Sequence, residues 1–265
     1  MEFTTNDGIQ LNYQSYGNGQ PVVFIHGFGG YQEIWTMQIK DFVDHGFNVI
    51  TYDQRNHGAS QFDSNLTKID RLIYDLKNLI DGLHLQDVVL VGHSMGASVI
   101  YGFFDKNLDE NVCAAVAVDQ SPKMIGNAAW PYGFMNATRA NYQEKLQELP
   151  HIRETLNGVK QKCRERVKIA QQQFPFDWSA CNLLLLDHAR QDWRKAVTSM
   201  KNPLLLMTAN QSPFFDGAFA DVMCTENQSY LSHIAVNQTG HCIMAEQPDK
   251  FNQTVQDFIN QKSKI

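Results

Sequence analysis

Short apolar runs alternate with longer amphipathic stretches along the first half of the chain. Each run has four to seven residues, mostly β-branched or small, which is typical of a strand buried on both faces of a sheet. These runs are residues 21–25, 48–52, 88–91 and 112–118. Residues 32–43, 69–83 and 97–104 instead suit helices, and apolar residues recur at helical spacing in 69–83. The alternation predicts an α/β fold, a mostly parallel twisted sheet flanked by helices.

Both ends of the chain add strands to this sheet. Residues 3–5 and 9–16 predict two antiparallel strands, because the Asp7-Gly8 pair between them is a strong hairpin turn signal. Near the other end, strands are expected at 203–209 and 230–236, and helices at 214–225 and 243–259. We expect ligands to bind beyond the carboxyl ends of the parallel strands.

Residues 121–200 break the alternation. This segment contains no convincing strand, but it has helical stretches at 152–170 and 182–197. We expect a helical cap at 121–200, inserted into a core formed by 1–120 and 201–265. A run of basic residues within 160–168 is interpreted as a solvated helix face rather than an anion site.

Charge and composition narrow the classes of partner. The 28 acidic residues outnumber the 22 basic ones and give a net charge of −6, which argues against nucleic acid as the main partner. No apolar run is long enough to cross a membrane, and the first residues lack the basic and apolar regions of a signal peptide. We therefore expect a cytoplasmic protein, a monomer or homodimer, that acts on a small molecule.

The cysteines and histidines offer no metal-binding pattern. The five cysteines are scattered and contain no C-x-x-C pair, which favours reduced thiols over a disulfide framework or a zinc site. No two histidines have the H-x-x-x-H spacing of a metal site. We expect neither a metal nor another cofactor.

Residues 92–96 read G-H-S-M-G and connect an expected strand directly to an expected helix. Such a sharp turn places the hydroxyl of Ser94 above the sheet, and the glycines at 92 and 96 keep side chains out of the crowded bend. The helix start also leaves free backbone N–H groups beside the serine, where they can stabilise a developing negative charge. The segment predicts a nucleophilic serine.

Three more motifs lie near expected strand ends, two of them before residues 92–96 and one after. Residues 26–30 read H-G-F-G-G, 53–60 read D-Q-R-N-H-G-A-S, and Gly240-His241 precedes the last helix. Together with residues 92–96, they make the chain resemble the α/β-hydrolase family over nearly its full length. Asn56 stands where this family usually has glycine; because asparagine tolerates left-handed backbone well, we expect the turn to survive.

The resemblance implies a role for each motif. Ser94 is the nucleophile, and His241 is the base that takes its proton, since the pKa of histidine lies near the working pH. The backbone N–H groups of Phe28 and Met95 are expected to form the oxyanion hole. His26 is expected to brace its loop, and His93 to be structural.

The acid of the triad departs from the commonest pattern of the family. Ser212 occupies the position after the strand at 203–209 where an aspartate is usual. We predict that Asp119, at the end of the strand that precedes the cap, replaces it, with Asp216 as the second candidate. A turn-capping role is the structural alternative for Asp119. Trp130, Phe134 and Trp178 are candidate substrate-binding residues, or else part of the core of the cap.

The sequence leaves three functions open. The first is a serine hydrolase that cleaves a small-to-medium carboxylic ester, thioester or lactone through an acyl-enzyme on Ser94. The second is a cofactor-free dioxygenase of the same fold, which needs the His–Asp pair but no nucleophilic serine. The third is a non-turnover ligand-binding or signalling homologue. A dehalogenase is disfavoured, because Ser94 stands where that branch needs a carboxylate.

Overall fold

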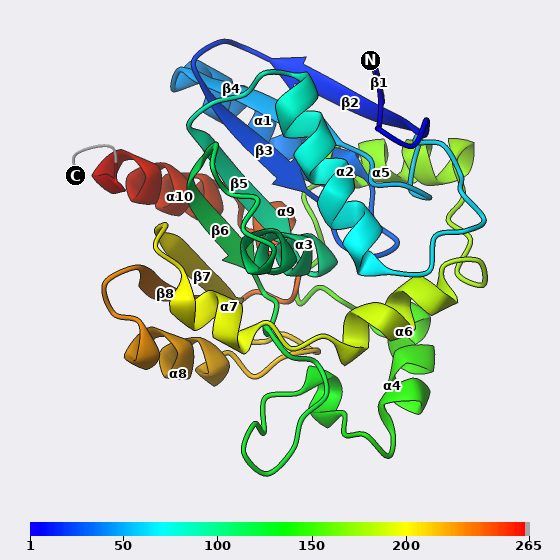
Figure 1. Ribbon diagram of the computed structural model, residues 1–265, viewed down its shortest axis with the longest axis vertical. Helices are drawn as coiled ribbons and strands as arrows, with labels where there is room; N and C mark the ends of the chain where they lie inside the picture. Colours follow the sequence, from blue (N-terminus) through cyan, green and yellow to red (C-terminus); the bar gives the residue numbers. More distant parts are fainter. Residues whose placement is uncertain (263–265) are drawn as a thin grey trace.

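A single eight-stranded sheet runs through the protein (Figure 1). The computed structural model describes residues 1–262, and the strand order across the sheet is β1-β2-β4-β3-β5-β6-β7-β8. The strands are β1 Glu2–Thr4, β2 Gln10–Tyr16, β3 Gln20–Ile25, β4 Phe47–Tyr52, β5 Val88–His93, β6 Val112–Val118, β7 Leu204–Ala209 and β8 Leu231–Val236. The first two pair in antiparallel fashion, and β3 to β8 are parallel. The predicted α/β fold is confirmed.

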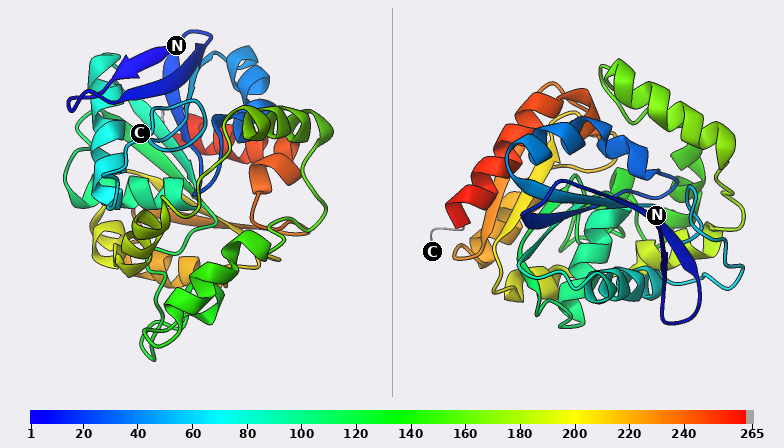
Figure 2. Two further views of the ribbon diagram at one scale, coloured as in Figure 1. Left: turned by 90° about the vertical axis from the view of Figure 1, so that its right-hand side faces the viewer. Right: turned by 90° about the horizontal axis from the view of Figure 1, so that it is seen from above.

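Helices cover both faces of the sheet. Figure 2 shows α1 and α10 on one face and α2 and α3 on the other. The core helices are α1 Thr36–Asp44, α2 Ile69–Gly82, α3 Met95–Asp105, α8 Ala218–Glu226, α9 Ile243–Glu246 and α10 Pro248–Lys262, and a 3₁₀ turn, η1 Gln32–Trp35, precedes α1.

Strand β5 shows why the central strands are apolar throughout. Val88 and Leu90 pack into the hydrophobic cluster beneath α2 and α3, whereas Val89 and Val91 pack into the cluster beneath α1 and α10. All four side chains are fully buried. Because successive residues of a strand point to opposite faces, a strand covered on both sides needs an apolar residue at every position.

Most of the chain between β6 and β7 lies beyond the carboxyl ends of the strands, whereas its last helix packs against α3 and α8 on one face of the sheet (Figure 1). Apart from three isolated bridges, the described chain forms no strand there. The helices are η2 Phe134–Asn136, α4 Tyr142–Glu148, η3 Leu149–His151, α5 Gln161–Gln173, α6 Asn182–Arg190 and α7 Arg194–Ser199.

Within 121–200, both expected helices are wrong in extent. Residues 152–160 are not helical, and α5 begins only at Gln161. The N–H groups of Leu156 and Asn157 bind the carboxylate of Glu246 instead of a preceding turn, and Gly158 has φ +78°. A tertiary contact therefore outweighs helix propensity in this segment.

The stretch 182–197 is two helices rather than one. Lys123 pairs with Asp192 through an isolated bridge and a 3.1 Å ion pair. The N–H of Trp193 donates to the carbonyl of Pro122. These contacts with the chain after β6 interrupt the helix between α6 and α7.

Candidate active site

Ser94 lies in the tight turn between β5 and α3. Its backbone has φ 53° and ψ −125°, which is a strained region for a residue with a side chain. The neighbouring glycines make the turn possible. A Cβ at Gly92 would overlap the backbone of Gly96, and a Cβ at Gly96 would overlap the carbonyl of Ile25. The predicted strand–serine–helix turn is therefore present, with the side chain of Ser94 only partly buried.

The loop after β3 runs close past Ser94. A Cβ added to Gly27 would lie 2.9 Å from the Cβ of Ser94, so a side chain at position 27 would force the two segments apart. Phe28 follows in this loop and lines the same cavity as Ser94. Met95 is the first residue of α3, and backbone N–H groups in the first turn of a helix have no partner within the helix. These two positions suit N–H donors to an oxyanion.

His26 ties this loop to the end of β4. Its Nε2 accepts the N–H of Gln54 at 3.0 Å, so Nδ1 carries the proton and donates to the carbonyl of Gly27 at 2.8 Å. The side-chain amide of Gln54 donates back to the carbonyl of His26. Burial lowers the pKa of His26 to about 4, so the ring is neutral. This arrangement agrees with the expected bracing role.

His241 and Asp119 form a buried pair. The imidazole Nδ1 and the carboxylate Oδ2 are 2.7 Å apart, and both side chains are at most 3% exposed. The same Oδ2 accepts the hydroxyl of Ser212 at 2.6 Å, and Oδ1 accepts the N–H of Ala209 at 2.9 Å. Three donors thus hold the carboxylate, and the ring of His241 is oriented with Nε2 free for other partners.

The two acid candidates are separated clearly by their positions. Asp216 is exposed, and its carboxylate accepts the N–H of Ala218 at the start of α8. Ser212, at the position usual for the acid, accepts N–H groups from Phe214 and Phe215 and donates its own proton to Asp119. The bond between Ser212 and Asp119 was not predicted from the sequence, although Ser212 stands at the position where the family usually has the acid.

Glu246 holds the loop that carries His241. Its Oε1 accepts the N–H of Gly240 at 2.9 Å, and its Oε2 accepts the N–H groups of Leu156 and Asn157. The N–H of His241 itself donates to the carbonyl of Glu154 at 2.8 Å. The buried carboxylate of Glu246 therefore joins the histidine loop to residues 156–157. Glu246 could not be singled out from the sequence, because a lone glutamate in a helix usually lies on the surface.

Ser94 and His241 line one small cavity beyond the carboxyl ends of the strands. Its free volume is about 30 Å³, roughly that of one water molecule. The other lining residues are Phe28, Gln120, Met124, Phe134, Leu149, Glu154, Leu185, His188, Phe214 and Phe215. Most of the wall is apolar, and much of it comes from the helices between β6 and β7.

The three aromatic candidates lie in different places. Phe134 lines the cavity and stacks on Phe214 with ring centroids 5.2 Å apart. Trp130 does not reach the cavity: its indole is buried against Tyr132 and under the guanidinium of Arg194. Trp178 is 38% exposed and contacts Phe28 from outside. The sequence indicated aromatic residues in this segment but not which of them face inward.

The loop after β4 keeps the expected backbone. Asn56 has φ 65°, so the asparagine adopts the left-handed conformation predicted for it. A Cβ at Gly58 would overlap the carboxylate of Asp53, which accepts the backbone N–H groups of Gln32 and Ala59. Asp53 therefore organises the loops beside the site.

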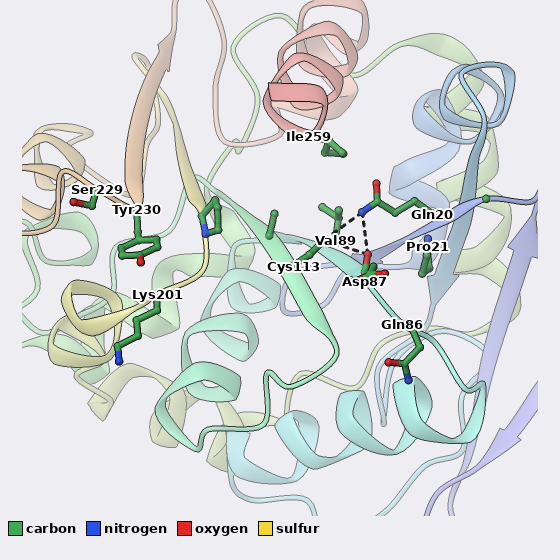
Figure 3. A pocket seen from close by; sticks show the side chains of 13 residues that line it. Gln20, Pro21, Gln86, Asp87, Val89, Cys113, Lys201, Ser229, Tyr230 and Ile259 are labelled. Carbon is green, nitrogen blue, oxygen red and sulfur yellow. Dashed lines mark hydrogen bonds between the residues drawn. The ribbon is translucent and has the colours of Figure 1, made fainter. Parts of the chain in front are cut away.

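A larger hollow opens at the opposite ends of the parallel strands, where these strands begin (Figure 3). Its volume is about 900 Å³. The amide of Gln20 points across it and donates to the carbonyl of Asp87 and to the sulfur of Cys113, which lies 3.2 Å away. Neither Ser94 nor His241 lines it. The hollow offers size without a paired nucleophile and base, so we place the candidate active site at the smaller cavity.

The described residues hold neither a metal cluster nor a membrane-spanning helix. Within residues 1–262, no group of three or more His, Cys, Asp or Glu side chains is arranged to hold a metal ion. In the same part of the chain, no helix combines the length and the apolar character needed to span a bilayer.

Known proteins similar to this chain include hydrolases. A 3-oxoadipate enol-lactonase of Acinetobacter baylyi is 26% identical, over 95% of this chain and 94% of that enzyme. A non-heme chloroperoxidase of Kitasatospora aureofaciens is 35% identical, but this match spans only 46% of the chain and 44% of the relative. Thus the chain covers less than half the length of this curated relative.

The fold is shared with solved structures. The structure of an esterase from Exiguobacterium antarcticum superposes with a TM-score of 0.83 at 18% identity, covering 98% of this chain and 99% of that one. The model of the alpha/beta hydrolase family matches residues 22–254. This match takes in the elbow at Ser94, the strand end at Asp119 and the loop at His241. The chain therefore belongs to the alpha/beta hydrolase family.

Proposed function

We propose that this protein is a serine hydrolase that cleaves a small-to-medium carboxylic ester, thioester or lactone. The observation that carries the proposal is the 2.7 Å bond between His241 Nδ1 and Asp119 Oδ2, at a cavity that also contains the strained Ser94. A buried carboxylate on Nδ1 leaves Nε2 as the acceptor that a serine hydroxyl needs. The likeness to a protein named an enol-lactonase, over nearly the whole chain, agrees with ester chemistry.

The proposed reaction has two halves. His241 takes the hydroxyl proton of Ser94 while the oxygen attacks the carbonyl carbon, and the N–H groups of Phe28 and Met95 stabilise the resulting oxyanion. The protonated imidazole, stabilised by Asp119, then gives its proton to the leaving alcohol as the acyl–oxygen bond breaks. Water, activated by the same histidine, hydrolyses the acyl-enzyme and regenerates the hydroxyl of Ser94.

Substrate entry requires the wall of the cavity to open. The free volume of about 30 Å³ is far below the several hundred Å³ of a typical ligand site. Met124, Phe134, Leu149 and Leu185 contribute apolar wall from the segment 121–200. We therefore infer that this segment acts as a cap that moves to admit substrate and then encloses it over Ser94.

Labelling with a fluorophosphonate probe tests the proposal. Such probes form a covalent bond with an activated serine, so intact mass and peptide mapping report whether Ser94 reacts. We expect labelling at Ser94 in the native protein and none after His241→Ala. We also expect Ser94→Ala to abolish turnover of 4-nitrophenyl butanoate.

Full turnover by Ser94→Ala would overturn the proposal. So would oxygen uptake with a heteroaromatic substrate that depends on His241 but not on Ser94, since this is the signature of the dioxygenase alternative. A well-folded protein that binds an ester without hydrolysing it would favour the non-turnover alternative.

A further inference from the structure

His188 is a buried polar side chain that the proposed mechanism does not use. It comes from α6, is 3% exposed and lines the cavity that contains Ser94 and His241. Its Nε2 is 2.8 Å from the hydroxyl of Ser98, which lies one turn after Ser94 in α3. Its Nδ1 is buried and has no hydrogen-bond partner among the described residues. One nitrogen of the ring is therefore fixed by the fold, and the other is left unpaired.

An unpaired buried nitrogen is costly, so it needs an explanation. Leaving a buried donor or acceptor without a partner costs about 1–3 kcal/mol. The other cavity walls around it are mainly apolar, and the side-chain nitrogen of Gln120 already donates to the carbonyl of Ser121. Because His188 lines this cavity, a ligand bound there could supply the partner that Nδ1 lacks.

The ring is neutral under working conditions. Burial lowers the pKa of His188 to about 3, so the imidazole has one N–H and one free lone pair. If the hydroxyl of Ser98 donates to Nε2, then Nδ1 is a donor; if Nε2–H donates to Ser98, then Nδ1 is an acceptor. A hydroxyl group on the ligand suits both cases, because it can donate and accept.

We propose that His188 recognises a hydroxyl group on the acyl part of the substrate, so that the preferred substrates are esters of hydroxy-substituted carboxylic acids. This inference rests on the proposed function. A carboxylate on the acyl part fits less well, because its charge would be buried beside the acidic side chain of Glu154 in the same cavity.

The position of His188 limits where the hydroxyl lies. Ser98 follows Ser94 by four residues, its hydroxyl holds the imidazole of His188, and His188 and Ser94 line the same small cavity. When Ser94 attacks the carbonyl carbon, His188 is therefore within reach of a group a few bonds further along the acyl chain. We therefore choose a 3-hydroxyacyl ester as the probe, because its hydroxyl lies two carbons beyond the carbonyl carbon.

Two esters of equal chain length provide the test. The value of kcat/KM is measured for 4-nitrophenyl 3-hydroxybutanoate and 4-nitrophenyl butanoate, and each is divided by the rate of its reaction with hydroxide. We expect the native enzyme to favour the hydroxy ester by about tenfold or more, which is the scale of one buried hydrogen bond. His188→Phe should bring the ratio close to one, and His188→Gln, whose amide also donates and accepts, should restore part of it.

Leu185→Met is the matched control. It alters another cavity residue of the same helix without touching a polar group, so the preference for the hydroxy ester should persist. If the corrected ratio of the two kcat/KM values is close to one in the native enzyme, the inference is wrong, and this result does not depend on any variant. A ratio that stays unchanged in His188→Phe also overturns the inference. If neither ester is hydrolysed in a reaction that depends on Ser94, the proposed function itself fails, which is a different outcome from hydrolysis without preference.

Discussion

Replacing Asp119 with asparagine puts an amide where three hydrogen-bond donors converge. Oδ1 accepts from the N–H of Ala209, and Oδ2 accepts from Ser212 and from Nδ1 of His241. An amide has one oxygen, so it satisfies only one side of this arrangement. With its oxygen toward Ala209, its NH₂ group faces His241 and forces the proton onto Nε2. With its oxygen toward His241, its NH₂ group faces the N–H of Ala209.

Both orientations slow the reaction, for different reasons. The first fixes the tautomer in which His241 cannot accept the proton of Ser94. The second leaves a buried donor unpaired, at about 1–3 kcal/mol, and still removes the charge that stabilises the imidazolium. We expect kcat/KM for 4-nitrophenyl butanoate to fall about 10³- to 10⁴-fold in Asp119→Asn. This loss corresponds to about 4–5.5 kcal/mol of transition-state stabilisation.

The rate is to be measured with steady-state kinetics and, independently, as the rate of labelling by a fluorophosphonate. Asp216→Asn is the matched control, since Asp216 is exposed and contacts the start of α8 rather than His241. We expect the control to retain native rates. Asp119→Asn with activity within tenfold of the native enzyme, in a sample that unfolds cooperatively, would refute the assignment of the acid. An equal loss in the control would point to Asp216 instead.

Three further changes test two other parts of the site and the stability of the fold around η1. Gly27→Ala should reduce kcat by at least 100-fold while KM changes little, because its Cβ would lie 2.9 Å from that of Ser94 and displace the oxyanion loop. Ser212→Ala should lower kcat/KM about tenfold and retain the pH profile, since Asp119 keeps two of its three donors. Burial raises the pKa of Glu33 from 4.5 to about 7, so the free energy of unfolding should decrease as pH rises between these values, and Glu33→Gln should remove that part of the decrease in urea titrations.

The sequence was sufficient for the sheet because burial on both faces constrains every position of a central strand. The run at 88–91 is apolar at each residue, and the structure buries all four of its side chains. Ser94 could be located for a related reason: its backbone strain requires glycine at 92 and 96, and this requirement is visible in the sequence. Where the local backbone or burial allows only certain residue types, the structure can be predicted from the sequence.

Other parts of the site depend on contacts that leave no local pattern. Glu246 binds N–H groups about 90 positions away, and His188 binds Ser98 at the same separation. An isolated glutamate or histidine in a helix is compatible with many environments, so neither residue type predicts its partner. The start of α5 was misplaced for the same reason, because the N–H groups of 156–157 bind Glu246 rather than a helical turn.

The position of the acid illustrates how two strand ends can exchange a role. β7 lies between β6, which ends before Asp119, and β8, which precedes the loop of His241, so the acid and the base reach toward each other across the end of β7. The loop after β7 carries Ser212 instead of an acid, and the hydroxyl of Ser212 donates to the carboxylate of Asp119. A serine at this point is therefore compatible with an acid on β6, whereas a second carboxylate there would place two negative charges against each other. The serine at 212 and the aspartate at 119 thus depend on each other, because the hydroxyl of one donates to the carboxylate of the other.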